Sequence, residues 1–361
     1  MIPGPTNVPE RIMKAMQKPI INHRGRDFHA LYERIEQGLK YLYQTENYVF
    51  PLAGSGTLAV EAAIANITEP NNTALVVNNG EFGSRMAETF RRYGANTFEI
   101  SADISSPVIE NLHEIIDKHL MNNKEIKYVG MVYTDTSTAI RNPLEKVADV
   151  VRMYGKIFIV DAVSALAGDY LDTNKLAVDL VASATQKCLA CPPGLGMVSV
   201  SERAWKNMED IEPRSLYCDL KRMRQYYDER RETPFTPNID GFYALEEGLN
   251  FLREEKLENR IKRHYECSQY LRDRLKELGL KLLVEKDEYA SKTVTAAYLP
   301  ENVNSNALRM KMEDEHGIVI AGGFGKLKEK IIRVATMGII KKEYVDRTTE
   351  ALKKSLKTFD I

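Results

Sequence analysis

Short apolar runs alternate with amphipathic, helix-like stretches over much of the first half of the chain. The apolar runs are NYVFPL (47–52), TALVVN (73–78), YVGMVY (128–133), KIFIVDA (156–162), VDLVAS (178–183) and GMVSV (196–200). Helical stretches at 58–67, 84–94 and 143–155 lie between several of them. This alternation predicts βαβ units and a mainly parallel sheet. Continuous apolar runs are typical of strands that are covered on both faces.

The rest of the chain has a different character and predicts a smaller α+β domain. We expect a long charged helix at roughly 241–277 and a last helix at 341–357. The strand candidates between them are KLLVE (281–285), TVTAAYL (293–299), GIVIAGG (317–323) and KIIRVATMG (330–338). We therefore predict an N-terminal arm over residues 1–20, a large domain over 21–245 and a small domain over 246–361.

The length and composition of the chain narrow the classes of function. At 361 residues the chain is long enough for two domains, and its formal net charge of −1 favours neither a nucleic acid nor a membrane surface as partner. No apolar run approaches the roughly 20 residues that span a bilayer, and no signal peptide is recognisable. Four cysteines do not make a disulfide framework. A cytoplasmic enzyme is the expectation.

Ligands bind at the carboxyl ends of the strands in an open α/β sheet, so the residues there deserve comparison. AGSGT (53–57) lies between a strand and a helix, where free N–H groups and the helix dipole favour a phosphate. The alternative is a plain turn in which Ser55 or Thr57 caps the helix. The same residues match the dinucleotide fingerprint G-x-G-x-x-A, with Glu81 after the next strand, so an NAD-linked dehydrogenase stays open.

Asp161 and Lys187 follow two other strands and suggest a more specific chemistry. Their spacing allows one crossover, so both side chains can face one cleft. A partly buried lysine loses pKa and becomes an amine nucleophile. In pyridoxal phosphate (PLP) enzymes the lysine forms a Schiff base with the cofactor, and an aspartate keeps the pyridine nitrogen protonated. Phe82 is a candidate to stack on the ring, with core packing as the alternative.

Ten segments, taken in order, carry a family resemblance. They are PGPTNVP (3–9), NHR (22–24), GSGT (54–57), NGEFGSR (79–85), TSTAI (136–140), VDAVSALAG (160–168), SATQKCLACPPGLG (183–196), TPFTPNI (233–239), GIVIAGGFG (317–325) and IIRVATMG (331–338). On these segments the chain resembles, nearly end to end, the class V, fold-type I PLP-dependent aminotransferases, and within them the alanine–glyoxylate and serine–pyruvate enzymes. The resemblance implies a mainly parallel seven-stranded sheet flanked by helices, with a smaller C-terminal α+β domain.

The resemblance also implies roles for individual residues. Lys187 matches the Schiff-base lysine, and Asp161 matches the partner of the pyridinium nitrogen. Arg333 matches the arginine that binds the substrate carboxylate, a task that suits a bidentate guanidinium. The other cofactor-binding positions that it implies are Ser55, Gly56, Thr57, Phe82, Thr136, Ser137, Val163, Gln186 and Thr236.

An N-terminal arm and a second subunit complete the implied pocket. Gly4 and Pro5 match an arm that lines the active site and contacts the substrate. Thr236 matches a threonine that reaches the phosphate from the partner subunit, so a homodimer with shared sites is implied. Tyr133 lies at a substrate-binding position where relatives often carry His, and Ala139 stands where they usually carry Gly.

The implied reaction is ping-pong transamination between a small amino acid, alanine or serine, and a small 2-keto acid, glyoxylate or pyruvate. Phosphoserine and aminoethylphosphonate aminotransferases share the framework and stay open as alternatives. Cysteine desulfurases need a nucleophilic cysteine in a small-domain loop, and residues 317–338 contain none. The Cys-x-x-Cys pair, Cys188 and Cys191, lacks the second paired motif of a zinc site, so we interpret it as incidental and expect no metal.

Overall fold

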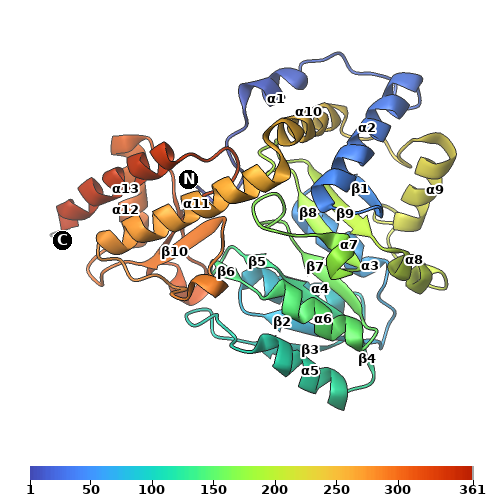
Figure 1. The fold of residues 1–361 in the computed structure, drawn as a ribbon, viewed down its shortest axis with the longest axis horizontal. Coiled ribbons are helices and arrows are strands. Elements are labelled where there is room, and N and C mark those ends of the chain that lie inside the picture. The colour runs from blue at the N-terminus through green and yellow to red at the C-terminus, as the bar shows by residue number, and fades with distance from the viewer. Residues whose placement is uncertain (360–361) are drawn as a thin grey trace.

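Seven strands form one central sheet in the computed structural model, which describes residues 1–359 (Figure 1). In spatial order they are β1 (Tyr48–Ala53), β9 (Leu195–Val200), β8 (Leu180–Ala184), β7 (Ile157–Asp161), β4 (Ile126–Val132), β2 (Thr73–Asn78) and β3 (Asn96–Ser101). β9 runs antiparallel to both neighbours, and the other pairs are parallel. The predicted mainly parallel sheet is therefore confirmed, and its carboxyl ends meet along one edge.

Helices cover the sheet and bury its central strands completely. The helix α3 packs on β8 and β9, α4 packs on β2 and β4, and α6 packs on β7. The helices of this part are α1 (Glu10–Ala15), α2 (Arg26–Tyr43), α3 (Gly56–Ala65), α4 (Glu81–Arg92), α5 (Leu112–Asn122), α6 (Leu144–Met153), α7 (Thr173–Leu176), α8 (Glu202–Met208), α9 (Leu220–Arg230) and α10 (Ile239–Glu255). In the part of the chain that the structure describes, no helix has the length and apolar character to cross a membrane.

A three-stranded antiparallel sheet forms the core of the C-terminal part, with the order β10-β12-β11. Its strands are β10 (Val294–Tyr298), β11 (Ala321–Gly322) and β12 (Ile331–Ala335), and its helices are α11 (Leu257–Glu277), α12 (Ser305–His316) and α13 (Lys342–Leu356). Leu271, Leu308 and Leu352 belong to its separate hydrophobic cluster. A separate two-stranded hairpin, β5 (Thr134–Asp135) and β6 (Ile140–Arg141), lies between the two parts.

The structure corrects several details of the sequence-based expectations. The helix expected at 241–277 is two helices, α10 and α11, because Lys256 has φ 68° and ψ 140° and interrupts the helical hydrogen bonds. The expected strand at 281–285 makes only an isolated bridge, between Leu282 and Ala297. The arm over residues 1–20 is extended at its start and contains the helix α1.

The dinucleotide interpretation of Gly54–Ala59 is wrong. Its fingerprint needs a strand inside a parallel βαβ unit, whereas β1 lies at the edge of the sheet and pairs antiparallel with β9. Glu81, the proposed ribose ligand, is the first residue of α4 and its side chain pairs with Arg85.

The positive-φ backbone conformation of Lys256 leads to a testable prediction about the stability of the fold. A side chain at φ 68° is strained by about 1–3 kcal/mol, and glycine relieves that strain. We expect Lys256→Gly to raise the free energy of unfolding by about 1 kcal/mol, after the entropy that glycine adds to the unfolded chain is subtracted. Urea unfolding measures it. Lys256→Ala keeps the strain and serves as the control, so an equal gain from both variants would contradict this account.

Candidate active site

Lys187 follows the carboxyl end of β8 and lines a cavity of about 160 Å³. The lining includes Ser55, Gly56, Thr57, Phe82, Asp161, Val163, Ser164 and Gln186. Burial lowers the pKa of the Lys187 amine, and the charge of Arg333 acts in the same direction. A larger share of this amine is therefore neutral and nucleophilic near pH 7 than for an exposed lysine.

Asp161 ends β7 and places a buried carboxylate in the same cavity. One oxygen, Oδ1, accepts the Val163 N–H at 2.9 Å. Burial raises the pKa of Asp161 to about 7, and the nearby carboxylate of Asp135 adds to the rise, while Val163 and Lys187 oppose it. A carboxylate in this position is stabilised by a protonated nitrogen brought next to it.

The N-terminus of α3 forms one wall of the cavity. Its N-cap, Ser55, makes no capping hydrogen bond with its side chain, so the alternative of a plain capped turn is not realised at Ser55. A Cβ at Gly56 would lie 2.7 Å from Val163 Cγ2, so only glycine lets the helix approach this closely. The Gln186 Oε1 atom is buried without a partner among the described residues. The first N–H groups of α3, with the Ser55 and Thr57 hydroxyls, can bind an anion here.

Phe82 is held in the cavity wall by a carboxylate from another element. Asp135 Oδ2 accepts the N–H groups of Phe82 at 3.0 Å and Gly83 at 3.2 Å, at the start of α4. Ser137 Oγ accepts the Glu81 N–H at 2.9 Å and donates to Asp135 Oδ1 at 2.5 Å. Asp135 and Ser137 thus supply the cap that Gly80 of α4 cannot. Ser137 is buried here and lies outside the cavity lining.

Arg333 comes from β12 of the C-terminal part, and its charge acts on Lys187 although it is not among the residues that line the cavity. Its Nε donates to the Gly322 carbonyl at 2.6 Å and its Nη1 to the Thr136 carbonyl at 2.7 Å. The guanidinium carbon lies 4.6 Å from the centre of the Phe324 ring. Burial lowers the pKa of Arg333 to about 10, so the group is still a cation at neutral pH. These contacts hold the guanidinium rigidly, which favours the capture of a carboxylate.

The N-terminal arm lies directly on the lysine loop. The Lys187 amine donates to the Pro3 carbonyl, and a Cβ at Gly4 would lie 2.7 Å from Lys187 Cδ. Thr6 donates its N–H to the Gln186 carbonyl at 3.1 Å and its hydroxyl to the Lys187 carbonyl at 3.1 Å. Pro5, between these contacts, is exposed. The arm therefore narrows the space beside the amine.

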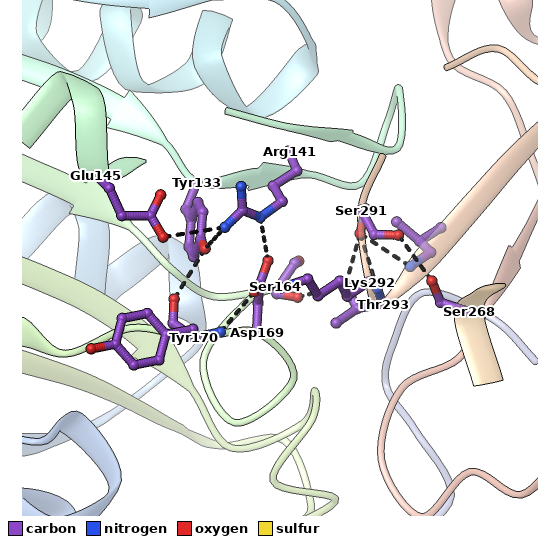
Figure 2. Close-up of polar contacts among 11 residues, drawn as sticks. Tyr133, Arg141, Glu145, Ser164, Asp169, Tyr170, Ser268, Ser291, Lys292 and Thr293 are labelled. Carbon is purple, nitrogen blue, oxygen red and sulfur yellow. Dashed lines mark hydrogen bonds and ion pairs between the residues drawn. The ribbon is translucent and has the colours of Figure 1, made fainter. Parts of the chain in front are cut away.

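Several predicted site residues do not line the cavity of this chain, among them Tyr133 and Thr236. The Tyr133 hydroxyl donates to the Tyr170 carbonyl at 3.0 Å and accepts from Arg141 Nη2 at 2.8 Å (Figure 2). Tyr133 is fully buried and does not line the cavity. Thr236 is exposed, in the segment that precedes α10. Asp135, Pro3 and Thr6 were given no role on the sequence, although Asp135 lies three residues after the end of β4.

The cysteine pair beside the lysine is buried. Burial raises the pKa of Cys188 and Cys191 to about 12, so both thiols stay protonated at neutral pH. Cys191 Sγ lies 3.4 Å from the Ala244 carbonyl, in the packing between the lysine loop and α10. Within residues 1–359 no group of three or more His, Cys, Asp or Glu side chains is arranged to hold a metal ion.

A lysine at a strand end of the central sheet and an arginine from the C-terminal part suit amino-group transfer. The chain belongs to the class-V aminotransferases, because the profile of the family described as "Aminotransferase class-V" matches residues 2–331. This fold is generally PLP-dependent. The chain is 37% identical to an uncharacterized aminotransferase of Methanocaldococcus jannaschii over 361 residues, which cover 99% of this chain and 92% of the relative.

Other similar proteins carry more specific names. An alanine–glyoxylate aminotransferase of Callithrix jacchus is 30% identical, and the match covers 98% of this chain and 86% of the relative. The crystal structure of a ureidoglycine–glyoxylate aminotransferase from Bacillus subtilis superposes with a TM-score of 0.95 at 30% identity, covering 100% of this chain and 93% of that one. The seven-stranded fold expected from the family resemblance is thereby confirmed.

The raised pKa of Asp161 predicts how stability depends on pH in the cofactor-free protein. Its folded pKa of about 7 lies above the unfolded value of 3.8, so the folded state binds the extra proton between these values. Stability therefore falls as pH rises from about 4 to 7 and then levels off. We expect cofactor-free Asp161→Asn to melt at a higher temperature than wild type at pH 8, with a smaller difference at pH 5. A difference that does not change with pH would contradict the raised pKa.

Proposed function

We propose that the enzyme uses PLP to transfer the amino group of alanine or serine to glyoxylate or pyruvate in a ping-pong reaction. The observation that carries the proposal is that Lys187 and Asp161 line one cavity and that Arg333 lies near enough for its charge to lower the pKa of Lys187. Glyoxylate as acceptor is supported by the names of two similar proteins, an alanine–glyoxylate and a ureidoglycine–glyoxylate aminotransferase. The same arginine can bind the carboxylate of both substrates, as a two-stage exchange through one site requires.

Residues that line the cavity suit the phosphate and the ring of PLP. The N–H groups at the start of α3 and the hydroxyls of Ser55 and Thr57 suit the phosphate, and Gln186 lies in the same lining. Phe82 and Val163 supply apolar walls for the ring. When bound, PLP supplies an electrophilic aldehyde and a ring that stabilises negative charge at the substrate Cα.

The side chains of the chain then have distinct tasks. Lys187 would hold the cofactor through its amine, and the same amine could accept the proton from the substrate Cα and return it. Asp161 would keep a proton on the ring nitrogen, because that positive charge would stabilise its buried carboxylate. Arg333 orients the substrate through its carboxylate. The backbone of Gly4 lies against Lys187, since a Cβ at Gly4 would lie 2.7 Å from Lys187 Cδ.

A second copy of the chain is part of the proposal. Thr236 is exposed and lies outside the cavity of its own chain. We infer that it reaches the phosphate site of a partner subunit, so that the active enzyme is a homodimer with shared sites. Thr136 acts differently, because its carbonyl accepts from Arg333 and its side chain is buried.

Reduction with borohydride tests the role of the lysine. We expect the holoenzyme, after reduction and digestion, to carry one pyridoxyl group, on Lys187, because this amine lines the cavity and has a lowered pKa. Lys187→Ala should lose the label, and its turnover should fall by at least about 1,000-fold. Peptide mass spectrometry locates the group, and Lys175→Ala on the surface helix α7 is the control. A label on another lysine would refute the assignment.

Substitution of the arginine tests substrate binding. Arg333→Lys keeps the charge and loses the fork that binds a carboxylate through two nitrogens. We expect KM for both alanine and glyoxylate to rise roughly tenfold or more, because the substitution removes one charge-assisted hydrogen bond to the carboxylate. Steady-state kinetics measure it. Arg309→Lys, on α12 next to Gly322, changes a neighbouring arginine and should leave KM unchanged. Equal effects of the two substitutions would count against the role of Arg333.

A further inference from the structure

A buried carboxylate, Asp169, joins the two domains (Figure 2). It is 1% exposed, and its Oδ2 accepts from Arg141 Nε at 2.7 Å while its Oδ1 accepts from Lys292 Nζ at 2.5 Å. The Tyr170 N–H also donates to Oδ1, at 2.7 Å. Arg141 belongs to the large domain and Lys292 to the segment that enters the small-domain sheet. A buried carboxylate loses much of its stabilisation when one cation is removed.

The segment 291–293 rests on the large domain at two further points. Thr293 Oγ1 donates to the Ser164 carbonyl at 2.8 Å, and the Ser291 N–H donates to the Ala139 carbonyl at 3.0 Å. Ser291 Oγ in turn accepts the Thr293 N–H at 3.0 Å, which fixes the local backbone (Figure 2). Ser164 lines the active-site cavity, three residues after Asp161. The small domain is therefore hydrogen-bonded to the loop that follows Asp161.

The same segment leads directly to the strand pair that carries Arg333. Lys292 precedes β10, in which Ala296 lies opposite Arg333 of β12. Arg333 also donates to the Thr136 carbonyl in the β5–β6 hairpin, and that hairpin ends at Arg141. Asp169 is therefore connected to Arg333 along two routes. One runs through Arg141 and the β5–β6 hairpin, and the other runs through Lys292 and β10.

We propose that Asp169 and Lys292 are positioning residues that set the place of Arg333 relative to the Asp161 loop, and thereby the affinity of the site for a substrate carboxylate. The inference rests on the proposed role of Arg333. Because the guanidinium binds through a rigid fork, a displacement of about 1 Å is enough to weaken productive binding by up to about 100-fold.

Two other ion pairs join the domains and provide matched controls. Lys286 pairs with Glu110, and Lys326 lies 3.0 Å from Asp103. The Lys286 and Glu110 side chains are 58% and 63% exposed, whereas Asp169 is 1% exposed. Exposed pairs contribute little because water and salt screen them. Lys286 and Glu110 both lie outside β10, β11 and β12.

The test compares Lys292→Met with Lys286→Met in the full-length holoenzyme. The readouts are KM and kcat for alanine and glyoxylate, the cofactor affinity, and the calorimetric Kd of propionate, a carboxylate that cannot react. We expect Lys292→Met to raise KM and the propionate Kd roughly tenfold with a smaller change in kcat and cofactor affinity. Lys292→Arg should restore wild-type values, and Lys286→Met should match wild type.

Several outcomes overturn the proposal. An unchanged propionate Kd in Lys292→Met would do so, and so would a loss of cofactor affinity as large as the loss of propionate affinity, which indicates general damage. Lys292→Gln keeps a hydrogen bond donor for Asp169 and serves if Lys292→Met does not fold. Failure of both to fold refutes a positioning role. If Arg333→Lys binds propionate with the wild-type Kd, the proposed role of Arg333 is refuted. If Arg333→Lys binds propionate more weakly but Lys292→Met binds it with the wild-type Kd, only the positioning role of Lys292 is refuted.

Discussion

The loss of water around Lys187 and Asp161 is the constraint on which the site depends. Burial lowers the pKa of the amine and raises that of the carboxylate, so each is shifted toward its neutral form before any ligand arrives. Such an arrangement is unfavourable for the protein alone, and a bound group that offers an aldehyde to one and a protonated nitrogen to the other stabilises both. The parallel sheet makes the burial possible, because β7 and β8 end side by side inside the protein.

Hydrogen bonds made by Asp135 and Thr136 hold the binding groups of the site in place. Asp135 caps α4 and so places Phe82, while the neighbouring Thr136 carbonyl holds Arg333. One turn thus connects the aromatic wall of the cavity to the guanidinium of the small domain. Both contacts use buried groups whose hydrogen bonds are strong and costly to break. The cavity is therefore built by groups that come from distant parts of the chain and constrain one another.

The accuracy of the sequence-based expectations followed the strength of the local signal. The buried strands were recognisable because their side chains are apolar on both faces, whereas β3 was missed because this edge strand carries partly exposed, mixed side chains. The break at Lys256 gave no signal, since no glycine or proline marks it. Tyr133 was expected at the substrate, but its hydroxyl pairs with Arg141 and Tyr170. Asp135 drew no attention because its partners lie about 50 residues away.

The sequence by itself determined the class of fold, through its alternating apolar and helix-like stretches. It marked Lys187 and Asp161 as candidates through their strand-end positions, and Arg333 through the family resemblance. Only the tertiary structure decided which groups share the cavity, which carboxylate caps α4 and how Asp169 joins the domains. The physical reason is that burial and hydrogen bonding depend on distances across the sheet and between domains. Those distances are set by packing, and no local pattern of residues encodes them.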